Sequence, residues 1–233
     1  MLHNPFSTKN TSPGKIPYYF NKGNFSLFHK TVSNVRDNFH TSKDGDLQQL
    51  YQGLSYLYSK FSEFEYRSQI IGQHGSGKTT LLVSFMSFLE NCNHKIISVI
   101  LHDNEQKLPK SFWEDYKKTK KWLKTQNEIN QKKTPIVVID GSEQLLASQR
   151  RKILQLCTTD RLGILVTTHK PIKQIPVLFQ TKTSPEILEM VVNYLLKKNG
   201  QTLPFDQSQY FTLLEQHHGN IRDILFSLYD LYE

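Results

Sequence analysis

Cysteine is scarce in this chain of 233 residues, which holds only Cys92 and Cys157. Neither cysteine belongs to a CxxC pair or to a cluster with histidines, so the spacing does not favour a zinc site. Two cysteines cannot build the disulfide framework of a secreted protein of this length, and a reducing compartment agrees best with their number. We therefore expect a cytoplasmic protein.

Long apolar segments are missing as well. The longest apolar runs have the length of strands, whereas a helix needs roughly 20 apolar residues to cross a bilayer. The start of the chain, MLHNPFSTKNTSPGKIPYYF, is polar and interrupted by prolines, which is not the pattern of a signal peptide. We expect no membrane span and no secretory leader.

Negative charge is in short supply, because 21 Asp and Glu face 29 Lys and Arg, for a net charge of +8. Such an excess favours polyanionic partners, but it is also found in ordinary basic proteins. The densest basic run lies in residues 117–133. One interpretation of this run is contact with nucleic acid or another acidic partner, with Trp113 or Trp122 available for stacking. The alternative is a solvated helix face with its apolar residues packed inward.

Apolar runs of strand length alternate with helical patterns through the middle of the chain. The runs are rich in Val, Ile and Leu, which is typical of strands buried on both faces, and they cover residues 68–72, 95–103, 135–140, 163–169 and 175–181. Helical spacing predicts helices at 47–61, 81–90, 111–126, with a capping box at Ser111, and 142–157. We predict an α/β fold with a parallel sheet in a three-layer arrangement.

The chain divides by pattern into three parts. Residues 1–43 form an irregular arm with one short strand at 15–20, and residues 44–182 form the α/β core. Three helical patterns, at 183–200, 206–219 and 220–233, predict a small C-terminal helical lid spanning residues 183–233.

The segment GQHGSGKTT, which we call the phosphate loop, follows the first core strand and opens a helix. Its residues fill the Walker A pattern G-x-x-x-x-G-K-[ST], whose glycines let backbone N–H groups point at phosphate oxygens. The Lys78 ammonium would reach the β- and γ-phosphates, and the Thr79 hydroxyl would bind Mg²⁺. The predicted nucleotide-binding residues are Gly72, Gln73, His74, Gly75, Ser76, Gly77, Lys78, Thr79 and Thr80.

A second metal-binding residue is expected at the end of the apolar run PIVVID. This run places Asp140 at the carboxyl end of a buried strand, where ligands gather in open α/β sheets. Asp140 would hold the hydration shell of the magnesium ion, in the manner of a Walker B aspartate. A carboxylate that only caps the next helix is the alternative.

Taken in order, the pieces GQHGSGKTT, PIVVIDGSEQL, GILVTTH and HHGNIRDIL resemble the AAA+ ATPases over residues 66–233. The chain is also similar to a group of small uncharacterised bacterial P-loop proteins that share HGSGKTT, DGSEQL and LYDLYE. The resemblance implies ATP and Mg²⁺ as ligands, Thr168 as a sensor of the γ-phosphate, and Arg222 as a second sensor on a lid helix. His169 is the alternative at the fourth strand, by similarity to the switch histidine of ABC ATPases.

The chain departs from the AAA+ pattern in two places. Gly141 stands where a catalytic glutamate usually follows the strand aspartate, so we assign that role to Glu143, which alternatively only caps its helix. The segment KPIKQ leaves no room for the helix that carries an arginine finger, which predicts a monomer or a transient oligomer.

Together these features predict an ATP-binding, Mg²⁺-dependent P-loop NTPase, with slow hydrolysis coupled to closure of the lid. The alternative is a nucleotide-dependent switch or nucleic-acid-binding protein with little turnover. A small-molecule kinase is the third interpretation, and the low arginine content of the lid argues against it.

Overall fold

The computed structural model describes residues 4–20, 45–125, 133–200 and 205–231. The chain forms two compact units, each assembled from separate stretches of sequence. We call them the loop unit, with residues 1–56, 72–84 and 181–233, and the sheet unit, with residues 57–71 and 85–180. This grouping reflects packing, and the predicted boundaries at residues 43 and 182 stay predictions.

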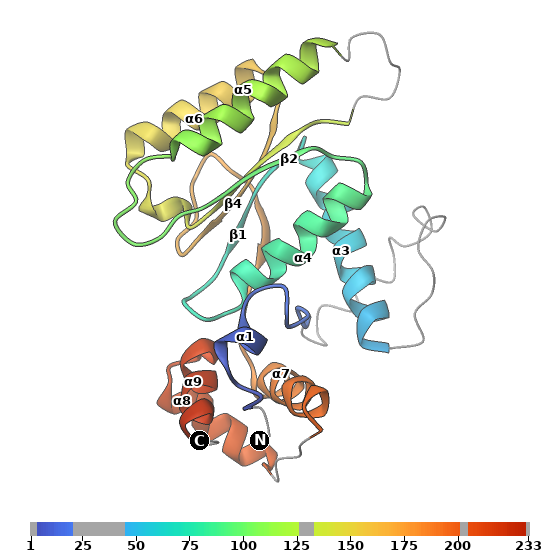
Figure 1. Cartoon of the computed structure of the whole chain (residues 1–233), viewed down its shortest axis with the longest axis vertical. Helices are drawn as coiled ribbons and strands as arrows, with labels where there is room; N and C mark the ends of the chain where they lie inside the picture. The colour runs from blue at the N-terminus through green and yellow to red at the C-terminus, as the bar shows by residue number, and fades with distance from the viewer. Residues whose placement is uncertain (1–3, 21–44, 126–132, 201–204, 232–233) are drawn as a thin grey trace. The chain divides into compact units, whose positions relative to one another are not determined.

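The sheet unit is built on five parallel strands (Figure 1). They are β1 (Arg67–Ile71), β2 (Ile96–Ile100), β3 (Ile136–Asp140), β4 (Gly163–Thr168) and β5 (Val177–Gln180). The spatial order is β2-β3-β4-β1-β5, so β4 lies between β1 and β3. All four pairings are parallel. The predicted fold class, an α/β core with a parallel sheet as in P-loop NTPases, is confirmed.

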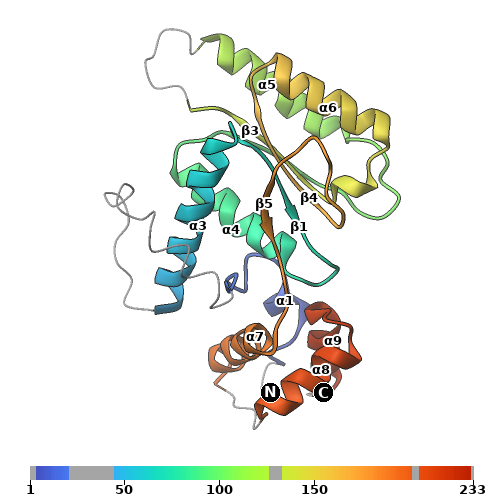
Figure 2. The same cartoon turned by 180° about the vertical axis from the view of Figure 1, so that it is seen from behind.

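Helices cover both faces of this sheet. α5 (Lys110–Thr125) and α6 (Ala147–Thr159) lie side by side on one face, as Figures 1 and 2 show from opposite sides. The other face is covered by the parts of α3 (Gly45–Glu63) and α4 (Lys78–Asn91) that belong to the sheet unit. Within the described part of the chain, no helix is both long and apolar enough to cross a membrane.

Burial on both faces explains why the central strands β3 and β4 read as continuous apolar runs, whereas the edge strands β2 and β5 carry exposed residues such as Ile100 and Val177. Alternate residues of β3 and β4 join one hydrophobic cluster with α5 and α6, and the residues between them, such as Val138 and Leu165, are equally buried. Since successive side chains of a strand point to opposite faces, these intervening residues serve the other layer. The cluster includes Phe112, Tyr116, Val137, Ile139, Ile153, Cys157, Ile164 and Val166.

The C-terminal helices belong to the loop unit. α7 (Pro185–Lys198), α8 (Gln207–Gln216) and α9 (Ile221–Leu231) gather around one apolar cluster (Figure 2). The Ser184 side chain caps α7, which has Pro185 at its start, and Asp206 forms a capping box with Gln209 on α8. These local signals account for the accuracy of the sequence prediction here.

The N-terminal arm is more closely packed than its sequence indicates. Phe6, Ile16 and Tyr19 are buried in the cluster of the C-terminal helices, beside the short helix α1 (Thr8–Thr11). The predicted strand at residues 15–20 is wrong, because that stretch contains only an isolated bridge between Pro13 and Ile16. Aromatic side chains hold this stretch in place without a strand partner.

Two predictions about helix starts are also corrected. The single helix expected over 142–157 is broken into the 3-10 turn η4 (Ser142–Gln144) and α6, because Leu145 and Leu146 adopt extended backbone. The buried Leu145 side chain joins the cluster under α6, which accounts for the break. α5 begins at Lys110, so Ser111 lies inside its first turn and is not the predicted cap.

Asp160 connects the end of α6 to α5. Tyr116 donates a hydrogen bond to this carboxylate, and the Lys120 ammonium lies 2.9 Å from its Oδ1. Burial opposes ionisation of Asp160, but these two contacts outweigh it and hold the pKa of the carboxyl below its usual value.

We predict that Asp160→Asn lowers the free energy of unfolding at neutral pH by about 1 kcal/mol. A lowered folded-state pKa contributes stability above the unfolded value of about 3.9, and this contribution disappears as the pH falls through the folded value. Urea unfolding should therefore give a larger difference between Asp160→Asn and the unaltered protein at pH 7 than at pH 3. Asp115→Asn is the control, because its pair with Lys118 is 58% and 71% exposed and should contribute nothing measurable. An equal loss at both pH values would contradict the assignment.

Candidate functional site

The phosphate loop has the backbone that its sequence predicts. Gly75 and Gly77 adopt positive φ angles of 66° and 86°, which favour glycine, and α4 begins at Lys78. The Lys78 ammonium donates to the carbonyl oxygens of Gly72 and Gln73, each at 2.8 Å. The loop therefore curls around its own lysine at the positive end of a helix, which is a suitable geometry for binding an anion.

Thr181, which the sequence analysis missed, supports the loop from beneath. The Ser76 hydroxyl lies 2.6 Å from Thr181 Oγ1 and donates to the Gln73 carbonyl at 2.8 Å. A Cβ atom on Gly72 would lie 2.0 Å from Thr181 Oγ1, so Gly72 has no room for a side chain. Thr181 directly follows β5, and no local pattern connects it with residues about a hundred positions earlier in the chain.

Asn220 brings the start of α9 against the same loop. Its Oδ1 accepts hydrogen bonds from the backbone N–H groups of Arg222 and Asp223, at 3.1 and 3.4 Å, and so caps the helix. A Cβ atom on Gly75 would lie 1.7 Å from this oxygen. Arg222 is exposed in the first turn of α9, two residues from the contact, and its role as a sensor stays a prediction.

The arm contributes a buried aromatic residue to the other side of the loop. A Cβ atom on Gly77 would lie 3.2 Å from the ring of Tyr18, which packs edge-on against Phe20 with ring centroids 5.0 Å apart. Burial raises the pKa of Tyr18, so the phenol stays neutral at physiological pH. Tyr18 thus supports the loop as a packing residue.

We predict that Gly75→Ala destabilises the protein more than Gly200→Ala does. Both glycines have nearly the same positive φ, 66° and 67°, but a Cβ on Gly200 meets nothing within 4 Å. The backbone penalty alone should be about 1 kcal/mol for Gly200→Ala, and the collision with Asn220 should bring the loss for Gly75→Ala to about 3 kcal/mol. Urea unfolding measures both. Equal losses would show that the Asn220 contact is unimportant, whereas a smaller loss for Gly75→Ala in an Asn220→Ala background would support it.

Asp140 lies where predicted, at the carboxyl end of β3, and is buried. The Thr167 hydroxyl donates to its Oδ1 and accepts a hydrogen bond of 2.8 Å from the Gly141 N–H. The Ser142 hydroxyl donates to the Thr167 carbonyl at 2.8 Å. Thr167 therefore orients the carboxylate and the turn after it. The sequence pattern predicts a γ-phosphate sensor at the neighbouring Thr168, which stays a prediction, and gives no role to Thr167.

Gly141 has a structural reason to be glycine. Its φ of 75° and ψ of 38° are left-handed, and a Cβ atom there would lie 2.9 Å from the Leu101 carbonyl oxygen. A glutamate at this position would need a different turn. The next carboxylate along the chain, Glu143, lies in the 3-10 turn η4.

Glu143 pairs with His169 across the ends of β3 and β4. Glu143 Oε1 lies 2.9 Å from His169 Nε2, and the other carboxylate oxygen is buried without a hydrogen-bond partner among the described residues. The Glu143 side chain does not cap η4. The buried Thr168 hydroxyl donates to the Lys170 carbonyl at 2.9 Å. His169 is therefore the side chain after β4 that contacts the candidate base, while the catalytic roles stay predictions.

We predict that Thr167→Val lowers the free energy of unfolding by about 2 to 3 kcal/mol, because it leaves both Asp140 and the Gly141 N–H without their buried partner. Thr168→Val is a matched control that removes one hydrogen bond to a carbonyl and should lose about 1 kcal/mol. Chemical denaturation compares the two variants. A loss from Thr167→Val no larger than that from Thr168→Val would contradict the positioning role.

The lysines of the basic run on α5 are exposed, but the two tryptophans of this helix are covered by lysines from other elements. Lys152 lies over the Trp113 ring and Lys95 over the Trp122 ring, at 5.2 and 5.1 Å from the centroids. The two tryptophans considered for base stacking are thus covered by lysines of the same chain. Residues 126–132 of the run lie outside the described residues, and its contact with nucleic acid stays a prediction.

Comparison with known proteins finds a likeness of fold alone. No model of a known protein family and no curated protein matches the chain. Among solved structures, the fold is similar to domain III of the Thermotoga maritima replication initiation protein DnaA, with 13% identity and a TM-score of 0.47. This alignment covers 98% of the present chain and 88% of the other. A likeness this weak does not assign a family.

Proposed function

We propose that this protein is an AAA+-like P-loop NTPase that binds ATP with Mg²⁺ and hydrolyses it slowly. One observation carries the proposal: the left-handed glycines of the phosphate loop, with the Lys78 ammonium held at the loop carbonyls and a helix starting at the same residue. Such a loop offers backbone N–H groups, a helix N-terminus and a lysine to one anion.

The loop residues hold the triphosphate in this proposal. The backbone from Gln73 to Thr80 encloses the phosphates, and Lys78 exchanges its bonds to the Gly72 and Gln73 carbonyls for bonds to phosphate oxygens. The support from Thr181 and Asn220 keeps the loop in shape. Because the loop is already ordered, little of the binding free energy is lost in ordering it when the ligand binds.

Thr79 and Asp140 are the residues proposed to hold the magnesium ion and its water. A hydroxyl and a carboxylate are oxygen donors of the kind that Mg²⁺ takes together with phosphates and water. Among the described residues no group of three or more His, Cys, Asp and Glu is placed to hold a metal by itself. When bound with a nucleotide, the ion would neutralise charge on the phosphates.

Glu143 is the proposed general base. It accepts a proton from the attacking water while the water oxygen forms a bond to the γ-phosphorus and the bond to the bridging oxygen breaks, releasing ADP and phosphate. In the structure Glu143 Oε1 is occupied by His169, which supports slow turnover. Thr168 and Arg222 are proposed to respond to the γ-phosphate, with closure of the C-terminal helices as the result.

A nucleotide-dependent switch with little turnover is the second candidate. The observations that favour it are the glycine at residue 141, whose turn excludes a glutamate, and the engaged Glu143 carboxylate. In both candidates the protein acts as a monomer or a transient oligomer and takes ATP in preference to GTP.

The two candidates are separated by measuring binding and turnover on the same variants. We expect the unaltered protein to bind a fluorescent ATP analogue and to reach full affinity only when Mg²⁺ is present. It should also release phosphate from ATP. Lys78→Ala should lose binding by about a hundredfold, since a charge-assisted contact to phosphate is removed. Glu143→Gln should bind normally and lose turnover by about a hundredfold.

Lys15→Ala is a control outside the loop with the same change of charge, and it should alter neither quantity. Unchanged turnover in Glu143→Gln, with turnover present in the unaltered protein, would remove Glu143 from the mechanism. Binding without turnover in the unaltered protein would establish the switch. Absence of nucleotide binding would overturn both candidates.

A further inference from the structure

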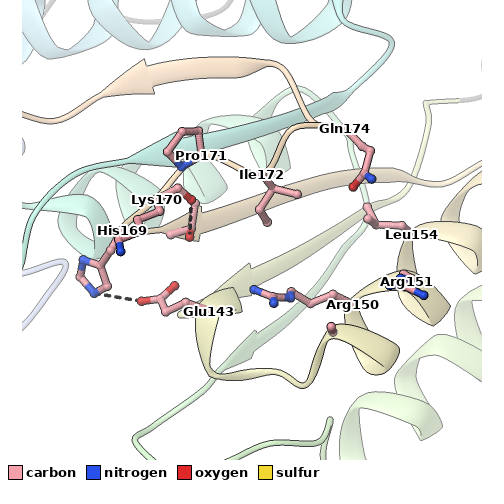
Figure 3. A pocket seen from close by; sticks show the side chains of 11 residues that line it. Glu143, Arg150, Arg151, Leu154, His169, Lys170, Pro171, Ile172 and Gln174 are labelled. Atoms are coloured by element: carbon pink, nitrogen blue, oxygen red, sulfur yellow. Dashed lines mark hydrogen bonds and ion pairs between the residues drawn. The ribbon is translucent and has the colours of Figure 1, made fainter.

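A cluster of cations lines a pocket in the sheet unit. The pocket has a volume of about 550 Å³, within the range of small-molecule sites. Its walls come from η4, α6 and the connection between β4 and β5 (Figure 3). None of its lining residues belongs to residues 72–80.

Positive charge dominates this pocket. Arg150, Arg151 and Lys170 contribute three fixed charges, His169 a titratable ring, and Glu143 the one carboxylate. Within the described residues, the side chains of Arg150, Arg151 and Lys170 make no hydrogen bond or ion pair. Figure 3 shows Arg150 reaching from α6 toward Glu143, whose second oxygen is the buried one without a partner. Three like charges gathered around a single carboxylate repel one another.

The start of α6 adds to this imbalance. Its N-cap residue, Leu146, supplies no side-chain hydrogen bond, and the first turn has no acidic residue. Instead Arg150 and Arg151 stand within its first five residues, and Ala147 lines the pocket. Cations near a helix N-terminus oppose its dipole, whereas an anion there is stabilised. The charge pattern is thus the reverse of what helix stability alone would select.

We propose that this pocket binds a phosphate group, carried by a small phosphorylated molecule or by a nucleic-acid strand. Two guanidinium groups offer paired donors that match phosphate oxygens, and Lys170 adds a third charge. The pocket has three fixed positive charges and one negative charge, and this imbalance favours a multiply charged oxyanion over a single carboxylate.

Occupation of the pocket acts on the pair formed by Glu143 and His169, because both residues line it. An anion beside His169 competes with Glu143 for the ring and frees the carboxylate. This consequence rests on the proposed hydrolysis, whereas the binding itself does not. Binding and turnover are therefore measured separately.

The direct test is calorimetric binding of pyrophosphate, with a fluorescent single-stranded oligonucleotide and a polyglutamate peptide as parallel probes. It is done on the full chain carrying Lys78→Ala, so that the phosphate loop contributes little to the signal. We expect pyrophosphate or the oligonucleotide to bind, and Arg150→Ala with Arg151→Ala to weaken that binding by about tenfold or more. Lys170→Ala should also weaken binding of the probe.

Matched controls lie next to each altered residue. Lys152 is on the same helix but lies over the Trp113 ring and outside the pocket, and Lys173 is on the same connection as Lys170 but also outside the pocket. Lys152→Ala and Lys173→Ala remove the same charge and should leave binding unchanged. The arginine variants in the chain with Lys78 intact should still bind ATP, which separates this site from the phosphate loop.

The outcomes are distinct. Binding of pyrophosphate supports a small phosphorylated ligand, and binding of the oligonucleotide alone supports a nucleic-acid strand; both support a phosphate site. Failure of both pyrophosphate and the oligonucleotide to bind overturns the proposal, as does binding of polyglutamate alone. Equal weakening by the control variants overturns it too, because it would show a general effect of charge. Stimulation of phosphate release by the bound probe would extend the proposal to Glu143.

Discussion

The contact between Gly75 and Asn220 is the constraint on which the loop unit depends. Gly75 can take its left-handed conformation without a side chain, and the space that a Cβ would fill holds the oxygen that caps α9. One glycine therefore sets both the curvature of the phosphate loop and the position of a helix more than a hundred residues later. Thr181 approaches the loop at Gly72 almost as closely, and the Tyr18 ring packs against Gly77 at a longer distance. The backbone of the phosphate loop is thus held by residues from three separate parts of the sequence.

In the sheet unit, two carboxylates at the end of a parallel strand are held by residues of the neighbouring strand and the turn after it. Thr167 holds Asp140 and the turn at Gly141 through one hydroxyl, and His169 holds Glu143. The two carboxylates thus have different surroundings: one is buried and fixed, and the other carries an oxygen with no partner among the described residues. This difference suits a metal-binding role for the first and an adjustable role for the second.

The basic residues of this protein differ in whether they have acidic partners. The lysines of α5 are partly neutralised by Asp115 and Asp160, and other lysines cover the tryptophans of α5. The arginines at the start of α6 have no such partners within the described residues. The density of basic residues along the sequence is therefore a poor guide to where an anion is held, because neutralisation depends on neighbours from other elements.

The sequence by itself determined the strands, most helices, the phosphate loop and the position of Asp140, because these follow from local periodicity, capping residues and glycine spacing. It could not place Thr167, Thr181 or Asn220, which act through neighbours that only the strand order and the packing of α9 supply. It also misjudged residues 15–20, where aromatic burial replaces a strand. The tertiary structure alone paired Glu143 with His169, since a side chain at the end of one strand finds its partner on the next strand in space.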